Sequence, residues 1–355
     1  MNEVSLGRQG GIDRHSLARW MKGAIDRALA LSGNRLVRRT IALAGLALDV
    51  QIDDPALAEI YFARFAPGQA LAGASGDRLY VLSGASSALV PPLWADANCS
   101  AKTYQAAVLK AGLRAAYPLI PRFWQFFDMD RRVGIQLAPD RQRLPKWDVA
   151  APLRRHLHWL LEERGSRLVH AATLGLEGRG LLILGKGGAG KSGTTLAGLV
   201  AGLSTAGDDY VALESGPVPV VRSLYRILKQ DRHGLNRLPG LSNRLIGRQA
   251  NWQGKIEFDP EEIFPGAIAD SLALTAIMIP RIARAPRPSI VPILPSAAML
   301  SLMSTNLHQH LGEPEHGMAF FAGILRRLPC YRIDLAEDAP ANGAALRKFL
   351  ETAPR

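Results

Sequence analysis

The chain has 355 residues and a formal net charge of +12, with 43 Lys and Arg against 31 Asp and Glu. Hydrophobic residues make up 48% of it, which is ample for a sizeable core in two domains or in one large domain. The longest apolar stretch, at residues 40–50, is about half of the roughly 20 residues that a membrane-spanning helix needs, so we expect no transmembrane segment.

Cysteine usage and the start of the chain indicate a compartment. Cys99 and Cys330 lie far apart and belong to no CxxC pair, which predicts reducing conditions, no disulfide framework and no structural zinc. Residues 1–14 are polar and contain glycine, unlike a secretory signal, so a cytoplasmic location is expected. The basic charge favours anionic partners, but no helix-turn-helix, zinc-finger or aromatic RNA-binding pattern accompanies it, and nucleic-acid binding is not expected.

Residues 1–145 predict a smaller α+β domain, in which roughly the first 12 residues are expected to be disordered. A helix from Asp13 carries apolar residues at helical spacing, namely Leu17, Trp20, Met21, Ala24, Ile25, Ala28 and Leu29. This stripe either packs on its own domain or docks on a partner or an anionic membrane surface, which would make the domain a docking module for a substrate or partner. Further helices are predicted at residues 55–65 and 101–116, and strands within residues 39–53 and at residues 78–82 and 133–137.

Residues 146–355 predict an α/β catalytic domain. After a helix at residues 149–163, the pattern predicts strands at residues 168–176 and 181–184, a helix from Lys191 to about residue 203 and a strand at residues 210–213. A later strand, at residues 272–279, ends at Pro280, and the remaining elements are helices at residues 297–303, 317–328 and 343–352 and a strand at residues 330–335. Such alternation indicates a mainly parallel or mixed sheet flanked by helices.

The phosphate-binding pattern GxxxxGK[ST] lies between the strand at residues 181–184 and the following helix, and its residues are Gly185, Lys186, Gly187, Gly188, Ala189, Gly190, Lys191 and Ser192. Glycines let backbone N–H groups turn inward around a phosphate, and the helix N-terminus adds a positive dipole. Lys191 is expected to reach the β- and γ-phosphates of ATP, and the Ser192 hydroxyl to ligate Mg²⁺. Gly193 completes the expected nucleotide-binding segment, at a position where many such loops carry a second hydroxyl.

Three polar residues near this loop are candidates for chemistry. Asp208 and Asp209 precede a strand at the distance at which the chain can return beside the loop, so that one could accept a proton and the other could hold a metal ion. The alternative is an ordinary acidic turn. His170 lies on the preceding strand, where a hairpin would bring it beside the phosphates, although a lone histidine between Val169 and Ala171 is also typical of a core.

Together these motifs resemble the HPr kinase/phosphorylase family, within the group that also contains phosphoenolpyruvate carboxykinase. The resemblance rests on His170, the phosphate loop and the triplet Gly207-Asp208-Asp209, and it covers roughly residue 148 to the C-terminus. A closer resemblance is to the HPr-kinase-like serine kinases of peptide biosynthesis clusters, including those that act on lasso-peptide precursors. That closer resemblance is carried by Pro152-Leu153-Arg154, Trp159, Val169 to Ala172, Gly207 to Tyr210, Ser223-Leu224-Tyr225, Lys229 and Leu300 to Thr305.

The resemblance implies a role for each residue of the site. It implies that Asp208 is the catalytic base, that Asp209 joins Ser192 on Mg²⁺, and that His170 lies near the transferred phosphoryl group. HPr kinases have an acidic residue in place of Gly193 and a glycine-rich signature after their aspartates. This chain has neither, which argues against HPr as the substrate and against a reverse phosphorylase activity, and the resemblance leaves a homo-oligomer open.

A basic segment at residues 222–255 follows the aspartates. Its charged residues are Arg222, Arg226, Lys229, Arg232, Arg237, Arg244, Arg248 and Lys255, against Asp231 alone. We expect Arg222, Lys229 and Lys255 to be candidates for holding an acidic substrate or a phosphate, and Arg281, directly after Pro280, to be a similar one. The alternative is a solvated region of loops and helices with no part in the chemistry.

The sequence therefore predicts a kinase that transfers the γ-phosphoryl group of ATP to a serine or other hydroxyl of a peptide or protein, for example a ribosomal peptide precursor. Two other functions fit the same motifs: a kinase of a small metabolite, and a nucleotide-gated binding module without enzymatic activity. Asp208, read as a base, favours an enzyme. The acceptor and the preference for ATP over GTP are not specified by the sequence.

Overall fold

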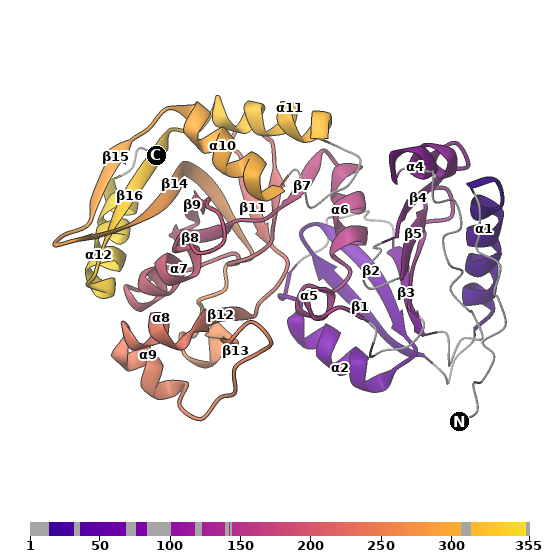
Figure 1. Ribbon diagram of the computed structural model, residues 1–355, viewed down its shortest axis with the longest axis horizontal. Helices are drawn as coiled ribbons and strands as arrows, with labels where there is room; N and C mark the ends of the chain where they lie inside the picture. The colour runs from indigo at the N-terminus through magenta and orange to yellow at the C-terminus, as the bar shows by residue number, and fades with distance from the viewer. Residues whose placement is uncertain are drawn as a thin grey trace, which may run out of the picture. The chain divides into compact units, whose positions relative to one another are not determined.

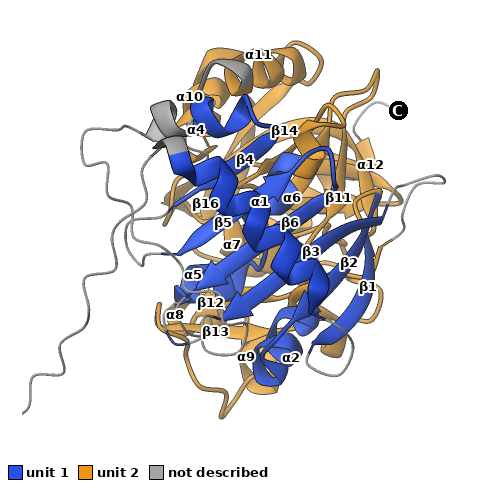
Figure 2. Ribbon diagram, turned by 90° about the vertical axis from the view of Figure 1, so that its right-hand side faces the viewer, with its two compact units in different colours: residues 1–42, 46–63, 71–159 blue, residues 43–45, 64–70, 160–355 orange. Residues whose placement is uncertain are grey.

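The structure, a computed structural model, describes residues 14–31, 36–68, 76–83, 101–117, 123–138, 142, 144–306 and 314–352. It divides the chain into two compact units, which Figure 2 shows in different colours. Unit 1 comprises Met1–Ala42, Leu46–Ala63 and Leu71–Trp159, and unit 2 comprises Leu43–Gly45, Arg64–Ala70 and Leu160–Arg355. The main change between units thus falls after Trp159. Cys99 and the segment expected to be disordered at the N-terminus lie outside the described residues.

Unit 1 is built on a six-stranded mixed sheet with the order β1-β2-β3-β6-β5-β4 (Figure 1). The strand pairs β2–β3 and β3–β6 are parallel, and β6–β5 and β5–β4 are antiparallel. The strands are β1 (Val37–Leu43), β2 (Leu46–Ile52), β3 (Gly76–Ser83), β4 (Leu113–Ala116), β5 (Trp124–Asp128) and β6 (Val133–Ala138). The helices are α1 (Arg14–Ala30), α2 (Pro55–Arg64), α4 (Ala101–Leu109), α5 (Lys146–Ala150) and α6 (Arg154–Glu162), the last of which continues into unit 2.

The helix α1 packs its apolar stripe on the sheet of its own unit. Five residues of the stripe have no exposed surface, namely Leu17, Met21, Ala24, Ile25 and Ala28. They join a core cluster with aromatic and aliphatic residues of β5 and β6. Burial of one such large apolar side chain contributes about 1.5–3 kcal/mol, so the stripe is held in the core and is not free to dock on a partner or a membrane.

Two stretches of unit 1 differ from the prediction. The helix predicted at residues 101–116 ends at Leu109, and Gly112, with φ of +77°, turns the chain into β4. A left-handed backbone at this place suits glycine and does not continue a helix. Residues 124–128, where no strand is predicted, form β5 with every residue buried. A strand buried throughout shows no alternation of polar and apolar residues, which explains why it was missed.

Unit 2 is built on an eight-stranded mixed sheet and a separate two-stranded sheet. The long strand β14 (Ser271–Ala285) is parallel to β9 (Arg179–Ile183) and to β16 (Cys330–Ala336), and antiparallel to β11 (Val220–Ser223). The other strands of the large sheet are β7 (Ser166–Val169), β8 (Ala172–Leu176), β10 (Val211–Glu214) and β15 (Ser289–Pro292), and the small sheet consists of β12 (Leu228–Asp231) and β13 (Lys255–Phe258). The helices are α7 (Lys191–Val200), α8 (Arg232–Asn236), α9 (Pro239–Arg244), α10 (Pro295–Asn306), α11 (Pro314–Leu325) and α12 (Ala339–Thr352), with a 3₁₀ turn at Pro260–Glu262.

Helices cover both faces of the large sheet because successive strand residues point to opposite faces. On β9, Leu182 belongs to the core cluster that contains residues of α10 and α11. Its neighbours Leu181 and Ile183 belong to the cluster that contains residues of α12. The wholly apolar sequence of this strand therefore reflects burial on both sides, and the mixed α/β architecture agrees with the predicted fold class.

Two predicted elements near the border of the units are interrupted. The helix expected at residues 149–163 is broken into α5 and α6, since Pro152 lies between them and Leu153 has φ of +57°. The strand expected at residues 168–176 is two strands, β7 and β8, and His170 lies at the break between them. The break directs the chain from one strand pair to another, because β7 pairs with β10 and β8 pairs with β9.

The strand β14 does not end at Pro280, as predicted, but continues to Ala285. The Met278 carbonyl accepts a hydrogen bond from Leu184, just beyond the end of β9. Pro280 lies two residues further on, so its backbone nitrogen faces the same side, where β9 has already ended. The N–H that proline lacks is therefore not needed there, which is the situation in which a strand tolerates proline.

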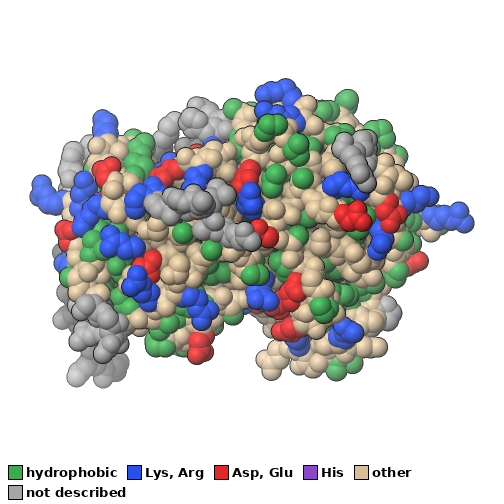
Figure 3. All heavy atoms as spheres, turned by 180° about the vertical axis from the view of Figure 1, so that it is seen from behind, with side chains coloured by type: hydrophobic (Ala, Val, Ile, Leu, Met, Phe, Trp, Pro, Cys, Tyr) green, Lys and Arg blue, Asp and Glu red, His purple; other side chains and the backbone are tan. Residues whose placement is uncertain are grey.

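Within the described residues, no helix is both long enough and apolar enough to cross a membrane. On the face that Figure 3 shows, Lys and Arg side chains are spread over the surface with Asp and Glu among them. The net charge of +12 is therefore not gathered into one continuous basic surface on that face.

Candidate functional site

The predicted phosphate loop connects β9 to α7. Leu184, at the start of the loop, donates its backbone N–H to the Met278 carbonyl at 2.9 Å, which anchors the loop to the large sheet. Gly190 is the N-cap residue of α7 and has φ of +100°. A Cβ on Gly190 would lie 3.0 Å from Leu335 Cδ1, so both the backbone conformation and the close packing require glycine.

The loop is open on the side where phosphate would lie. A Cβ added to Gly187 or Gly188 would meet no heavy atom within 4 Å, and both glycines line a cavity of about 430 Å³. No side chain caps the N-terminus of α7, so its first N–H groups remain available to an anion. These features fit a triphosphate held by backbone N–H groups.

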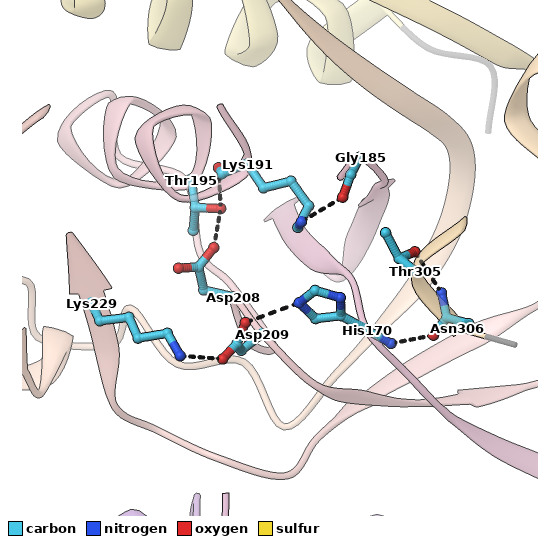
Figure 4. A network of polar contacts seen from close by, with 9 residues as sticks. All are labelled: His170, Gly185, Lys191, Thr195, Asp208, Asp209, Lys229, Thr305 and Asn306. Atoms are coloured by element: carbon cyan, nitrogen blue, oxygen red, sulfur yellow. Dashed lines mark hydrogen bonds and ion pairs between the residues drawn. The ribbon is translucent and has the colours of Figure 1, made fainter. Parts of the chain in front are cut away.

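Lys191 is the first residue of α7 and is 8% exposed. Its ammonium donates a hydrogen bond to the Gly185 carbonyl at 2.6 Å, which folds the side chain back over the loop (Figure 4). Burial lowers the pKa of Lys191, and the charges of Lys255 and Lys229 act in the same direction, whereas those of Asp208 and Asp209 oppose it. An anion bound in the loop would relieve this unfavourable environment.

The cavity brings together residues that are far apart in the sequence. It is lined by His170, Asp209, Lys229 and Lys255, and by the loop residues Lys186, Gly187, Gly188, Gly190, Lys191, Ser192 and Gly193. Gly185, Ala189 and Asp208 are not part of this lining. Gly193 has no positive φ, and a Cβ there would make an ordinary contact at 3.5 Å with Gln230 Nε2. The structure therefore gives no steric reason for glycine at position 193.

Asp208 lies behind the first turn of α7 and is 6% exposed. Its carboxylate accepts a hydrogen bond from the Thr195 hydroxyl at 3.3 Å. Burial, and then the neighbouring charge of Asp209, raise the pKa of Asp208 to about 7, against the opposing effects of a hydrogen bond from Ser192 and the charge of Lys191. A carboxylate with a pKa near neutrality can take up a proton under the conditions in which most enzymes work.

Asp209 has the opposite electrostatic environment. Its two oxygens are bonded by His170 Nε2 at 3.1 Å and by Lys229 Nζ at 2.5 Å, as Figure 4 shows. Burial raises the pKa of Asp209, but the hydrogen bond from His170 and the charge of Lys229 outweigh that effect and hold the pKa well below its usual range. The pKa of Lys229 is raised in turn, because Asp209 outweighs its burial. Asp209 is therefore held ionised and suited to a cation.

Hydrogen bonds hold both the backbone and the side chain of His170. Its backbone N–H donates to Asn306 Oδ1 at 2.6 Å, and Asn306 in turn donates to the Thr305 hydroxyl at 3.0 Å. Since Asp209 can only accept, Nε2 of His170 carries the hydrogen of their bond. Nδ1 of His170 is buried and has no partner among the described residues. The histidine thus orients Asp209 and lines the cavity with it.

Mg²⁺ fits the donor set of this site only in part. No group of three or more His, Cys, Asp or Glu side chains that could enclose a metal ion occurs in the described part of the chain. Mg²⁺ does not need such an enclosure, because it is usually held by one or two carboxylates together with waters and substrate phosphates. Ser192 lowers the pKa of Asp208, whereas Asp209 contacts the ammonium of Lys229. The predicted pair of Ser192 and Asp209 could hold a metal ion only if Lys229 releases Asp209.

The structure does not bring Arg222 and Arg281 to the cavity. Arg222 donates to Glu214 at 2.6 Å between β11 and β10. Arg281 makes two hydrogen bonds to Asp334, at 2.7 and 2.6 Å. Its neighbour Ile282 lines the cavity, and successive side chains of a strand point to opposite faces, so Arg281 is directed to the other face of the sheet.

The rest of the basic segment is ordered mostly by partners that lie outside it. Arg226 and Arg248 form ion pairs with Asp259 and Glu262. Arg232, Arg237 and Arg244 donate to backbone carbonyls, and the residues that accept are Arg248, Ala336, Glu337 and Ile263. The segment is therefore built into unit 2, with Lys229, Lys255 and Arg237 on the cavity.

Thr194 and Gln230 are among the cavity residues that were not predicted. Thr194 is 1% exposed, lines the cavity, and its hydroxyl has no partner among the described residues. Its place in the first turn of α7, three residues after Lys191, was a signal that could have identified it. Gln230 also lines the cavity, but a single glutamine between charged residues carries no signal in the sequence.

Comparisons with known proteins leave the family of this chain open. No family model matches the chain, and no curated protein matches it. One solved structure that matches is the Hpr(Ser) kinase/phosphatase from Coxiella burnetii, which is 15% identical, covers 52% of this chain and 93% of its own, and has a TM-score of 0.27. A likeness with so low a TM-score carries no conclusion about this chain, so its function has to be inferred from the geometry of the site.

Proposed function

We propose that this protein is a phosphotransferase that moves the γ-phosphoryl group of ATP to a serine or other hydroxyl of a peptide or protein. The observation that carries the proposal is a pair of adjacent carboxylates with opposite pKa shifts beside the lysine of a phosphate loop. Neighbouring titratable groups whose environments separate their pKa values are typical of acid–base sites. The resemblance of the motifs to HPr-kinase-like serine kinases supports a peptide serine as the acceptor.

In the proposed reaction, the acceptor oxygen forms a bond to the γ-phosphorus while the bond from that phosphorus to the bridging oxygen breaks. Asp208 takes the proton of the acceptor hydroxyl, and ADP leaves. Lys191 and the N–H groups of the loop hold the phosphates in place, since positioning and charge stabilisation account for most of the catalysis of phosphoryl transfer. His170 keeps Asp209 oriented. Mg²⁺, when bound by Ser192 and a carboxylate of the pair, would neutralise charge on the phosphate oxygens.

The test is phosphorylation of a library of serine-containing peptides, followed by mass spectrometry after incubation with ATP and Mg²⁺. We expect a gain of one phosphoryl group with the natural protein, and none with Lys191→Ala or in the presence of EDTA. Lys191→Ala deletes the ammonium that reaches the phosphates, so calorimetry should show triphosphate binding weakened strongly. Unchanged affinity of Lys191→Ala for ATP would falsify the nucleotide site, and transfer that persists in EDTA would remove the metal from it.

A further inference from the structure

The two-stranded sheet of β12 and β13 forms a ribbon that faces the phosphate loop. Its strands are antiparallel, with Lys229 opposite Glu257 and Asp231 opposite Lys255. Alternation sends Leu228, Ile256 and Phe258 into a core cluster with residues of α7. The other face of the ribbon carries Lys229 and Lys255, which both line the cavity. Two positive charges are thereby presented to the phosphate loop from outside the loop itself.

Most basic groups of the cavity already have a partner within the protein. Lys191 donates to the Gly185 carbonyl, Lys229 is paired with Asp209, and Arg237 donates to the carbonyls of Ala336 and Glu337. Two lysines differ, because no carboxylate among the described residues lies within 4.0 Å of their ammonium groups: Lys186, which is exposed on the loop, and Lys255, which is half-buried on the ribbon. The cross-strand neighbour of Lys255, Asp231, points its carboxylate at the Gly234 N–H, at 2.7 Å, where it caps α8.

The backbone of Lys255 is held firmly, although no carboxylate in the described part of the chain pairs with its ammonium. Asn251 donates its N–H to the Lys255 carbonyl at 2.7 Å, and Asn251 Oδ1 accepts the Lys255 N–H at 3.1 Å. Asn251 also donates to Glu257 at 2.7 Å, and Glu257 is paired with Arg64 at 2.6 Å. Only the flexible side chain of Lys255 is therefore left to order when an anion binds, which lowers the entropy that binding costs.

Four lysines line one cavity, namely Lys186 on the loop together with Lys191, Lys229 and Lys255. Like charges gathered in a partly buried space repel each other, and an anion placed between them offsets this cost. Lys191 marks the position of the β- and γ-phosphates in loops of this kind, and Lys255 lines the same cavity from the ribbon. The anion that Lys255 meets is therefore the terminal part of the triphosphate.

We propose that Lys255 binds the γ-phosphoryl group of the nucleoside triphosphate from the ribbon side of the cavity, opposite the phosphate loop, and so distinguishes triphosphate from diphosphate. This inference rests on the proposed function and names the residue that recognises the transferable group. It also predicts fast dissociation of the diphosphate after transfer, because the diphosphate no longer carries the phosphoryl group that Lys255 contacts.

The experiment is calorimetric titration with ADP and with a non-hydrolysable ATP analogue, both with Mg²⁺. The proteins compared are the natural chain, Lys255→Gln, Lys255→Met and the matched surface variant Lys348→Gln. A hydrogen bond between charged groups is worth about 1.5–3 kcal/mol, which corresponds to roughly a 10- to 100-fold change in affinity. We expect a loss of this size for the ATP analogue with both variants of Lys255, a change of less than about two-fold for ADP, and no change with Lys348→Gln.

Three other results would contradict the proposed role of Lys255. Equal losses for ADP and for the ATP analogue would show that Lys255 supports the fold or the inner phosphates, and thermal melting of Lys255→Met would separate these two. An unchanged affinity for the ATP analogue would remove Lys255 from the triphosphate and leave the acceptor as its ligand. If the natural protein binds neither nucleotide, the proposed function itself fails, and this inference fails with it.

Discussion

Each unit of the molecule buries a carboxylate in a polar network, and the two networks differ in what they leave open. In unit 1, Asp148 accepts hydrogen bonds from Tyr61 at 2.6 Å, from Gln136 at 2.8 Å and from Gln125 at 3.4 Å. All four side chains are buried, and Gln125 also donates to Gln136 at 2.8 Å. The donors are neutral and point inward, so this network is closed on itself.

In unit 2, Asp209 is paired with Lys229 and lines a cavity, and its buried neighbour Asp208 is influenced by the charge of Lys191. Burial raises the pKa of Asp148 and of Asp208 alike. A raised pKa therefore does not by itself distinguish a functional carboxylate from a structural one, as ion-pair and hydrogen-bond networks in a core shift pKa values too. The distinguishing features here are the cavity and the cations that converge on it.

The same substitution in the two networks should have different consequences, and the larger one is expected at Asp208. Asp208→Asn keeps the shape of the side chain and removes the proton acceptor. A general base contributes about 10²- to 10⁴-fold, so we expect transfer to fall by that factor while ATP binding and the fold are kept. Initial rates across a Mg²⁺ titration check this.

Asp209→Asn serves as the control in the same titration, because its proposed task is to bind a cation. We expect its rate to recover at higher Mg²⁺, unlike that of Asp208→Asn. Transfer near that of the natural protein by Asp208→Asn at saturating Mg²⁺ would remove Asp208 from the mechanism. The binding-module alternative would then gain support.

The next largest effect, on the stability of the fold, is expected at His156, a buried histidine of unit 1. It is fully buried, and its Nε2 lies 3.2 Å from the carbonyls of Phe126 and Ile135. Two acceptors require Nε2 to carry the hydrogen, and Nδ1 has no partner among the described residues. Gly134 makes room for the ring, since a Cβ there would lie 2.8 Å from it. Burial lowers the pKa of His156 to about 4.

This shift predicts how stability depends on pH. Between the ordinary histidine pKa of 6.5 and about 4, the unfolded chain binds a proton at His156 that the folded chain does not. Stability from this group is therefore complete above pH 6.5 and is lost as the pH falls towards 4, by about 3 kcal/mol in total. Urea titrations over this range should show the slope, and His156→Gln should lose it. Exposed His233, changed to Gln, is the control; an unaltered slope in His156→Gln would assign it to another group.

A smaller effect is expected when the closed network is altered conservatively. Asp148→Asn removes a carboxyl whose ionisation is disfavoured by burial, and its amide oxygen can still accept from Tyr61 and Gln136. The amide nitrogen then faces the donor of Gln125, which leaves one weak hydrogen bond unmade. We expect a loss of about 1 kcal/mol in the free energy of unfolding and no change in transfer. A loss of transfer comparable with that of Asp208→Asn would show that the network of unit 1 takes part in the reaction.

Local patterns allowed the strand and the helix on either side of GxxxxGK[ST] to be predicted from the sequence, and the structure contains both. Phosphate binding by the loop between them stays a prediction. The stripe of α1 was predictable from a local pattern too. Boundaries that depend on one residue were harder: Gly112 ends a helix that composition would continue, and Pro280 stays inside β14 because a neighbouring strand has already ended.

The partners of the charged residues could not be predicted, because they depend on the register between strands. The sequence of the basic segment contains one acidic residue, Asp231. The structure supplies the others from outside the segment: Asp209 for Lys229, Glu214 for Arg222 and Asp259 for Arg226. Half of the basic residues of the segment therefore have a carboxylate partner from outside it, and Lys255 stands out within the segment only once the pairings are known.

The smallest effect on the kinetic constants is expected at Arg222 and Arg281, which are paired away from the cavity. Lys229, which is paired inside the cavity, is the residue to compare with them. Arg222→Gln and Arg281→Gln each remove one partner of a partly exposed ion pair. Such pairs contribute about 0–1 kcal/mol to stability. Because neither arginine lines the cavity, we expect kcat and the KM values for ATP and acceptor to change by less than about two-fold. Lys229→Gln should instead release Asp209 and change the Mg²⁺ dependence of the rate. Steady-state kinetics of the three variants across a Mg²⁺ titration make the comparison. If Arg281→Gln raised the KM for the acceptor several-fold and left that for ATP unchanged, Arg281 would reach the acceptor despite its bonds to Asp334, and the far face of β14 would belong to the site.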